Sequence, residues 1–220
     1  MPVFFQHQIN DTTRLGIWKI EESEDFFKGN VPLHRNVTHP HKRLQHLAGR
    51  FLLQFLFPDF PYDLIQIADT RKPFLPNEQF HFSISHCGDY AAAIVSSDKR
   101  VGIDIELVTP RIEKVADKFL HSVEDNFFNE DYLSYLKQWN LDRQVRLEFL
   151  TLIWTSKEAI YKWYGNGEMD FKNHMQLCGD LRFHEDEWLE LPFQLRKGEG
   201  RKMKIEAKVF PQLVLAFTQS

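Results

Sequence analysis

The feature that most constrains the fold is a pair of neighbouring β-strand patterns joined by a very short connection. Phe80–His86 alternates between apolar and polar side chains, and Tyr90–Ser96 forms the second strand pattern. Only Cys87, Gly88 and Asp89 separate them. A connection of this length allows a hairpin turn but no crossover between parallel strands. The chain is therefore expected to contain an antiparallel sheet.

The rest of the chain predicts a mixture of strands and helices. After Pro110 a helical region extends to about Gly165, with breaks near Ser122 and at residues 139–142, and residues 169–219 return to strands. Each half thus combines helices with antiparallel strands, which predicts an α+β fold of two lobes, residues 1–99 and 100–220. A second pair of strands is expected at residues 3–9 and 15–20, around a turn at residues 11–13. Further expected elements are a strand at 64–68, a short helix between Ser23 and Gly29, a long helix over 40–57, and no regular structure over 71–77, where two prolines occur.

Composition narrows the class of protein. Of the 220 residues 43% are hydrophobic, and the 20 phenylalanines predict a phenylalanine-rich core. A net charge of −4 argues against nucleic-acid binding as the main role. The two cysteines suggest neither a disulfide framework nor a zinc site. No signal-peptide pattern or membrane-spanning run is present, so we expect a cytoplasmic protein that does not bind membranes.

Two acidic residues on one expected strand suggest a metal site. In residues 101–106, VGIDIE, the apolar residues alternate with Gly102, Asp104 and Glu106, so both carboxylates would lie on one strand face. Like charges repel unless a cation lies between them, and Mg²⁺ prefers oxygen ligands. The alternative is the exposed polar face of an ordinary strand. Ser85 and His86 end another strand, where they either contact a ligand or simply precede a turn.

Two expected helices carry further candidate residues. On residues 152–167, Glu158 and Lys162 lie one turn apart, either as a solvated ion pair or as groups that bind a cation and a phosphate. On residues 40–57, Arg43, His46 and Arg50 lie in a row that is either a solvated basic face or an anion site. The buried stripe of that helix is predicted to consist of Leu44, Leu47, Ala48, Phe51 and Phe55.

Four motifs in order resemble one known family. KPFLP (72–76), FSISH (82–86), VGIDIE (101–106) and WTSKEAIYK (154–162) are similar to motifs of the Sfp-type 4′-phosphopantetheinyl transferases. The family patterns are close to G-K-P-x-x-P, F-N-x-S-H-S, G-[IV]-D-[IV]-E and W-x-x-K-E-[AS]-x-x-K. AGRFLL (48–53) is a weaker match to A-H-R-x-L-L.

The resemblance implies two lobes related by a pseudo-twofold axis, with coenzyme A in the cleft between them. Asp104, Glu106 and Glu158 would hold Mg²⁺ against the pyrophosphate of coenzyme A. Lys162 would face the leaving phosphate. The further expected contacts to coenzyme A are Lys72, Ser85, His86 and Arg50, together with Arg43, which is added only for its helical alignment with Arg50.

The implied reaction transfers 4′-phosphopantetheine to a serine hydroxyl of an apo acyl or peptidyl carrier protein and releases 3′,5′-ADP. Glu158 would act as the base, directly or through a water, and a monomer is expected to suffice. The sequence departs from the family at Cys87, where Ser is common, and at Asn166, where Lys is frequent. The group that recognises the 3′-phosphate is unassigned.

Two other functions stay open on the sequence: a non-catalytic module that binds coenzyme A or a carrier protein, and an Mg²⁺-dependent phosphohydrolase. The carrier protein served is not specified by the sequence. Phe119, Phe127 and Phe128 either dock the carrier or belong to the core, and the core is favoured.

Overall fold

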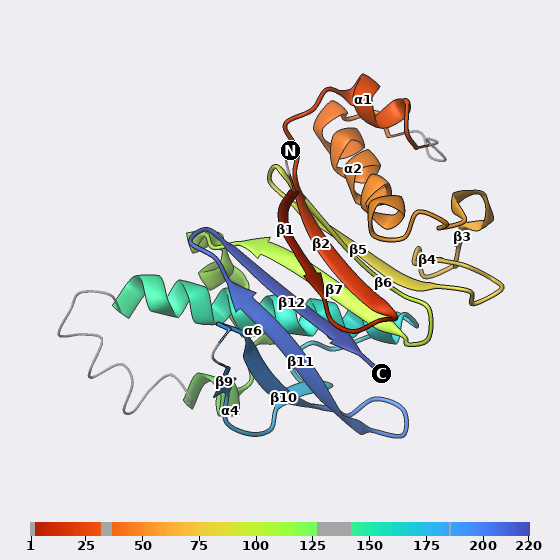
Figure 1. The fold of residues 1–220 in the computed structure, drawn as a ribbon. Coiled ribbons are helices and arrows are strands. Elements are labelled where there is room, and N and C mark those ends of the chain that lie inside the picture. Colours follow the sequence, from red (N-terminus) through yellow and green to blue (C-terminus); the bar gives the residue numbers. More distant parts are fainter. Residues whose placement is uncertain (1–2, 32–36, 127–141, 185) are drawn as a thin grey trace. The chain divides into compact units, whose positions relative to one another are not determined.

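The computed structural model describes residues 3–31, 37–126, 142–184 and 186–220 (Figure 1). It has the mixed α+β composition that the sequence predicts. The chain divides into two compact units. Unit 1 contains Met1–Ile105, Lys162–Asn166 and Gln219–Ser220, and unit 2 contains Glu106–Tyr161 and Gly167–Thr218. The lobe boundary expected between residues 99 and 100 stays a prediction.

Unit 1 is built on a four-stranded antiparallel sheet in the order β1 (Val3–Gln8), β2 (Thr13–Lys19), β6 (Tyr90–Ser96), β5 (His81–Cys87). The two hairpins predicted from the sequence are thereby confirmed. Gly88 has φ +49° in the β5–β6 turn, a conformation that glycine adopts without strain.

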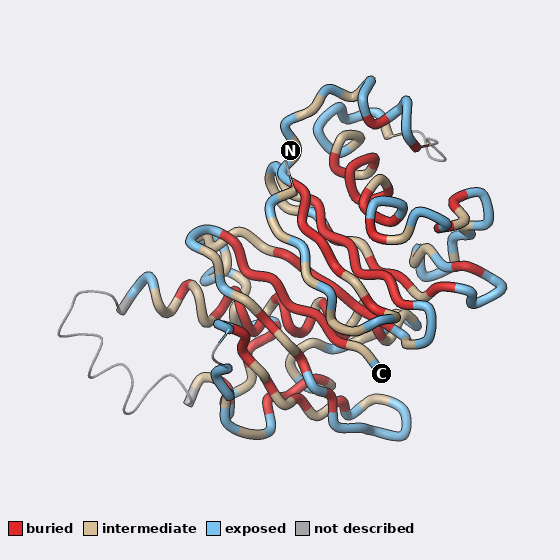
Figure 2. Tube along the Cα trace, in the orientation of Figure 1, coloured by how far each residue is buried: buried red, intermediate tan, exposed pale blue. Residues whose placement is uncertain are grey.

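Helix α2 (Pro40–Leu56) covers one face of this sheet, with α1 (Glu24–Lys28) packed beside it (Figure 1). Figure 2 shows buried residues along the side of α2 that faces the strands. Small side chains allow the close approach: Ala91 and Ala93 of β6 are fully buried, and a Cβ at Gly49 would lie 2.5 Å from Ile84 Cγ2. Helix α1 begins and ends as predicted, with Ser23 and Gly29 at its caps.

The buried face of α2 differs from the predicted stripe. Leu47 and Ala48 are buried as expected, but Phe55 is 37% exposed and Arg50 is only 4% exposed. The prediction placed Arg50 beside the apolar stripe because helical periodicity fixes spacing but not which way the helix is rotated on its sheet. The buried residues of α2 are Gln45, Leu47, Ala48, Gly49, Arg50, Leu52, Leu53 and Leu56.

A short ribbon extends from the end of α2. After the 3₁₀ turn η1 (Tyr62–Leu64), β3 (Gln66–Ile67) pairs with β4 (Pro73–Phe74). The strand predicted over 64–68 is therefore only two residues long. The prediction of no regular structure over 71–77 was wrong at β4, because proline is tolerated as the first residue of a strand at a sheet edge.

A second large sheet has the strand order β7 (Val101–Leu107), β12 (Leu213–Gln219), β11 (Arg201–Val209), β10 (Leu189–Leu195), β8 (Met175–Leu177), with β9 (Arg182–Phe183) paired to β10. The first five residues of β7 count with unit 1. The helical elements that the structure describes after β7 are η2 (Pro110–Val115), α3 (Ala116–Phe119), α4 (Ser122–Asn126) and α6 (Asp142–Tyr164).

Phenylalanine is prominent in the core, as predicted. Phe119 is fully buried and so belongs to the core, whereas Phe127 and Phe128 lie outside the described residues. Within the described ranges no helix is both long and apolar enough to cross a membrane. The other buried phenylalanines in the described part of the chain are Phe27, Phe60, Phe80, Phe82, Phe193 and Phe217.

Candidate active site

Three of the predicted site residues meet at one buried carboxylate in unit 1. Asp104, on β7, is 3% exposed, and its Oδ1 accepts hydrogen bonds from Lys162 Nζ at 2.7 Å and from Ser85 Oγ at 2.6 Å. A second serine of β5 supports the contact, because Ser83 Oγ accepts a hydrogen bond from Ile103 N at 3.2 Å. The alternative of an exposed polar strand face therefore does not apply to Asp104.

The second oxygen of this carboxylate is also buried. Asp104 Oδ2 has no hydrogen-bond partner among the residues that the structure describes. Buried polar atoms are rarely left unpaired, because the lost hydration costs about 1 to 3 kcal/mol. An ionised carboxylate with one free oxygen has the donor chemistry of a ligand for a hard cation such as Mg²⁺.

The end of helix α6, which carries Lys162, is held by side chains from distant parts of the sequence. Lys72 Nζ donates to Lys162 O at 2.5 Å, Arg100 Nη2 to Tyr164 O at 2.5 Å, and Thr70 Oγ1 to Gly165 O at 2.9 Å. Carbonyls in the last turn of a helix lack partners within the helix, and cations favour that end. These contacts fix the backbone from which Lys162 projects.

The amine of Lys72 lies at this helix end, and its expected contact with the nucleotide phosphates stays a prediction. Burial, with a smaller contribution from Arg100, lowers the pKa of Lys72 to about 8. Arg100, which the sequence reasoning missed, also lies over the ring of Trp163, 5.1 Å from its centroid. No local pattern distinguished Arg100 from an ordinary turn residue.

A pocket of about 650 Å³ opens beside α2 in unit 1. Its polar lining consists of His46, Arg50, Arg71 and His86, and no acidic residue of the described ranges is part of the lining. The apolar part of the lining consists of Ile65, Ile67, Pro73 and Ile84. The row of basic residues predicted on α2 therefore contributes two of its three members to a pocket. That pocket combines positive charge with an apolar wall.

Arg50 is the deepest cation of the pocket. Its side chain is buried, and Nη1 has no hydrogen-bond partner among the described residues. Burial lowers the pKa of Arg50, yet arginine stays protonated in proteins. The Tyr62 hydroxyl holds the backbone there, donating to Arg50 O at 2.5 Å and accepting from Gln54 N at 3.2 Å. A buried and unpaired guanidinium is suited to bind an anion.

Arg43 does not line this pocket. Its Nε and Nη2 donate to the two carboxylate oxygens of Glu24, both at 2.7 Å, and Nη1 donates to Val37 O at 2.9 Å. All of its nitrogens are thus used to hold α1 and the chain before α2. The expected contact with coenzyme A has no support in this geometry, because helical alignment with Arg50 does not show where a long side chain ends.

His86 lies near both the pocket and the buried carboxylate. The pKa of His86 is lowered, mainly by burial among protein atoms. The charges of Lys162 and Lys42 lower it further, whereas the charge of Asp104 raises it. The imidazole is therefore mostly neutral at pH 7. It can accept or donate a hydrogen bond without adding a fixed charge.

The other expected site residues belong to unit 2. Glu106 Oε1 accepts a hydrogen bond from Trp154 Nε1 at 3.3 Å, and the Trp154 ring stacks on Phe171 with centroids 5.3 Å apart. Glu158 is partly buried on α6. Among the described residues no three His, Cys, Asp or Glu side chains are grouped to hold a metal ion. The Mg²⁺ site of Asp104, Glu106 and Glu158 stays a prediction.

One buried ion pair of unit 2 was not foreseen. Lys157 and Glu124 are both fully buried, with Nζ 2.7 Å from Oε2, and Lys157 Nζ also donates to Phe119 O at 2.6 Å. The sequence held a signal, because Lys157 follows Ile153 by four residues and precedes Ile160 by three, which places it on the apolar face. The pair ties α6 to α4.

Comparison with known proteins decides the family. A model of the 4′-phosphopantetheinyl transferase superfamily matches residues 100–213, which is more than half of the chain. The chain belongs to this superfamily. The matched segment contains Asp104, Glu106, Glu158 and Lys162, so the resemblance inferred from the motifs is confirmed.

Individual curated proteins are also similar to the chain. It is 32% identical over 124 residues to the 4′-phosphopantetheinyl transferase AcpT of Escherichia coli O157:H7, covering 56% of this chain and 59% of that one. It is 30% identical over 132 residues to the L-aminoadipate-semialdehyde dehydrogenase-phosphopantetheinyl transferase of Xenopus laevis, covering 55% and 43%. It is 29% identical over 125 residues to enterobactin synthase component D of Salmonella austin, covering 57% and 49%. The chain spans about half the length of the curated relatives it matches.

Proposed function

We propose that this superfamily member transfers the 4′-phosphopantetheine group of coenzyme A to a serine hydroxyl of an apo carrier protein, with Mg²⁺, and releases 3′,5′-ADP. The observation that supports it most is the buried carboxylate of Asp104, whose Oδ1 binds Lys162 and Ser85 and whose Oδ2 is unpaired. A module that only binds coenzyme A has no need for a buried acid with one free oxygen.

Asp104, through Oδ2, together with Glu106 and Glu158, would hold the metal. When bound, Mg²⁺ supplies positive charge to the pyrophosphate of coenzyme A. The pseudo-twofold arrangement of two lobes, a cytoplasmic location and a monomeric state belong to the same proposal. The carrier protein is left as an acyl or peptidyl carrier.

In the transfer, the serine oxygen forms a bond to the β-phosphorus, and the bond from that phosphorus to the bridging oxygen breaks. Glu158 accepts the proton of the hydroxyl, directly or through a water. Lys162 stabilises the charge that develops on the departing 3′,5′-ADP, which lowers the barrier because the charge is larger in the transition state than in the bound substrate. Its ion pair with Asp104 fixes the ammonium before the substrate arrives.

The test is the intact mass of an apo acyl carrier protein after incubation with this protein, coenzyme A and Mg²⁺. We expect a gain of one phosphopantetheine that is lost with EDTA and with Glu158→Gln. Glu148→Gln is the matched control, because Glu148 lies on the same helix and contacts Gln144 instead. This control should keep its activity.

Two outcomes would contradict the proposal. Coenzyme A binding without a mass gain on any of several carrier proteins would indicate a non-catalytic binding module. Release of 3′,5′-ADP with no modified protein would indicate a phosphohydrolase that uses water as the acceptor.

A further inference from the structure

Arg71 is a residue of the pocket that the sequence motifs did not assign. It is exposed and lines the pocket together with Arg50, His46 and His86. Its guanidinium has no hydrogen bond or ion pair to any residue in the described part of the chain, unlike Arg43, whose nitrogens are all engaged by Glu24 and Val37 O. No side-chain contact within the described residues therefore explains why an arginine lies at this pocket.

The backbone of Arg71 is strained. Its φ is +65°, in the left-handed region that disfavours residues with a Cβ. The turn between β3 and β4 imposes this value, because Arg71 N donates to Ala68 O at 2.8 Å and Ala68 N to Lys72 O at 2.9 Å. Glycine would adopt the same turn freely, so the arginine at this position is explained by what its side chain does.

The two side chains that leave this turn reach different targets. Lys72 donates to the end of α6, close to the backbone of Lys162, while Arg71 lines the pocket. The pocket joins cations to an apolar wall that includes Ile67 and Pro73. Such a lining suits a phosphate carried by a nucleoside, with the base against the wall and the phosphate at the guanidinium groups.

We propose that Arg71 binds the 3′-phosphate of coenzyme A and makes the protein distinguish coenzyme A from 3′-dephospho-coenzyme A. The inference rests on the proposed function, in which the pyrophosphate lies at Lys162 and Asp104. That leaves the 3′-phosphate as the remaining anion for the pocket. A terminal phosphate carries nearly two charges at pH 7 and offers three oxygens, which match the planar fork of arginine.

Titration calorimetry with four ligands tests the proposal without any transfer reaction: coenzyme A and 3′-dephospho-coenzyme A, and 3′,5′-ADP and 5′-AMP. Arg71→Gly should weaken coenzyme A and 3′,5′-ADP by about tenfold, the effect of one solvent-exposed charged hydrogen bond. The two ligands without a 3′-phosphate should keep their affinity. Arg71→Lys should recover part of the loss, because it keeps the charge but not the fork.

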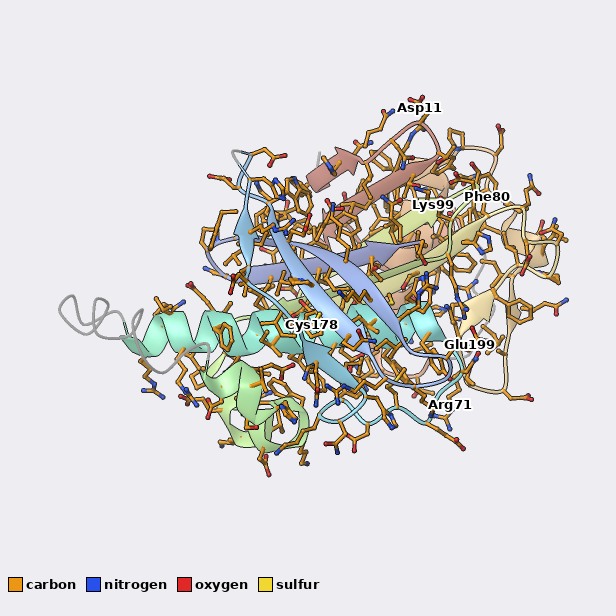
Figure 3. All side chains as sticks on the ribbon, turned by 90° about the horizontal axis from the view of Figure 1, so that it is seen from below. Asp11, Arg71, Phe80, Lys99, Cys178 and Glu199 are labelled. Carbon is orange, nitrogen blue, oxygen red and sulfur yellow. The ribbon has the colours of Figure 1, made fainter. Side chains whose placement is uncertain are left out.

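Two control variants test whether the loss of a positive charge, or the relief of backbone strain, is enough by itself to change the affinity. Lys99→Ala removes a cation of unit 1 that lies well apart from Arg71 in Figure 3 and outside the pocket lining. Glu168→Gly relieves a comparable backbone strain, since φ of Glu168 is +47°. Neither should change the preference for the 3′-phosphate. Arg71→Gly should also keep the melting temperature, because relief of strain offsets the entropy that glycine adds to the unfolded chain.

Equal weakening of all four ligands by Arg71→Gly would overturn the proposal and place Arg71 at the pyrophosphate. Unchanged binding of all four would show that Arg71 contacts no ligand. If the preference for the 3′-phosphate is lost as expected but no carrier protein is modified, the inference about Arg71 stands and the transferase proposal fails.

Discussion

Arg43 and Arg50 lie about two helical turns apart on α2, yet they have opposite surroundings. The Arg43 guanidinium forms a bidentate pair with Glu24, whereas Arg50 is buried with Nη1 unpaired. A paired arginine contributes to the fold. A buried cation without a partner destabilises the free protein until an anion binds.

This contrast predicts opposite effects for one substitution at two positions. Arg50→Met keeps an unbranched apolar stem and removes the unpaired charge, so we expect the free energy of unfolding to rise by roughly 1 kcal/mol. The affinity for coenzyme A should fall by at least about tenfold. Urea denaturation and calorimetry measure the two quantities.

Arg43→Met is the matched control on the same helix. It should not increase stability, because it leaves Glu24 without its main partner, and it should leave the affinity for coenzyme A unchanged. A loss of coenzyme A binding in Arg43→Met as large as in Arg50→Met would restore the contact expected from the sequence. It would also contradict the view that the contacts with Glu24 and Val37 O occupy the Arg43 guanidinium.

Helix α6 carries Lys162 of the candidate site and is held in place by side chains from other segments. Near its middle the buried Lys157–Glu124 pair ties it to α4, and at its end the carbonyls of Lys162 and Tyr164 are capped by Lys72 and Arg100. Gly165 ends the helix with φ +73°. A Cβ there would lie 2.9 Å from Lys72 Cδ and 3.2 Å from Arg100 Nη2.

Gly165→Ala should therefore lower both stability and turnover. The left-handed backbone alone costs about 1 kcal/mol, and the added methyl displaces the two capping side chains, which shifts Lys162. Gly198→Ala is the control, because Gly198 has φ +69° but no atom within 4 Å of an added Cβ. It should show only the backbone cost. Equal turnover for the two variants, each measured with the carrier-protein assay, would refute the link between the cap and Lys162.

At the scale of the whole molecule, the chain does not divide at a single point. Unit 1 takes the strand residues up to Ile105, then Lys162–Asn166 and the last two residues. Arg100 and Ser220 exchange both backbone hydrogen bonds at 3.0 Å. The beginning, middle and end of the sequence thus contribute to one compact unit.

A fragment of residues 1–99, the lobe expected from the sequence, should consequently fail to fold on its own. It lacks the fully buried Ile103 and Ile105 of β7 and the segment around Gly165. We expect circular dichroism to show no cooperative thermal transition for the fragment under conditions where the full chain melts cooperatively. A sharp transition in the fragment would show that unit 1 needs none of the later segments.

Local pattern was enough to predict the hairpins of unit 1, the extent of α1 and α2, the strand that carries Asp104 and the family itself. These features depend on residue periodicity, turn residues and motif order, all of which are properties of short stretches. The burial of Lys157 could also have been predicted, because its spacing from Ile153 and Ile160 places it on the apolar face of the helix.

Only the tertiary structure decided where the charged side chains end. Arg50 became buried because Gly49 lets α2 approach Ile84 closely, and Lys72 reaches a carbonyl that is ninety residues away in sequence. Arg71 was placed at the pocket by a strained turn. Sequence spacing fixes the face of a helix or strand, but the end point of a long side chain depends on contacts between distant segments, and those exist only in the folded chain.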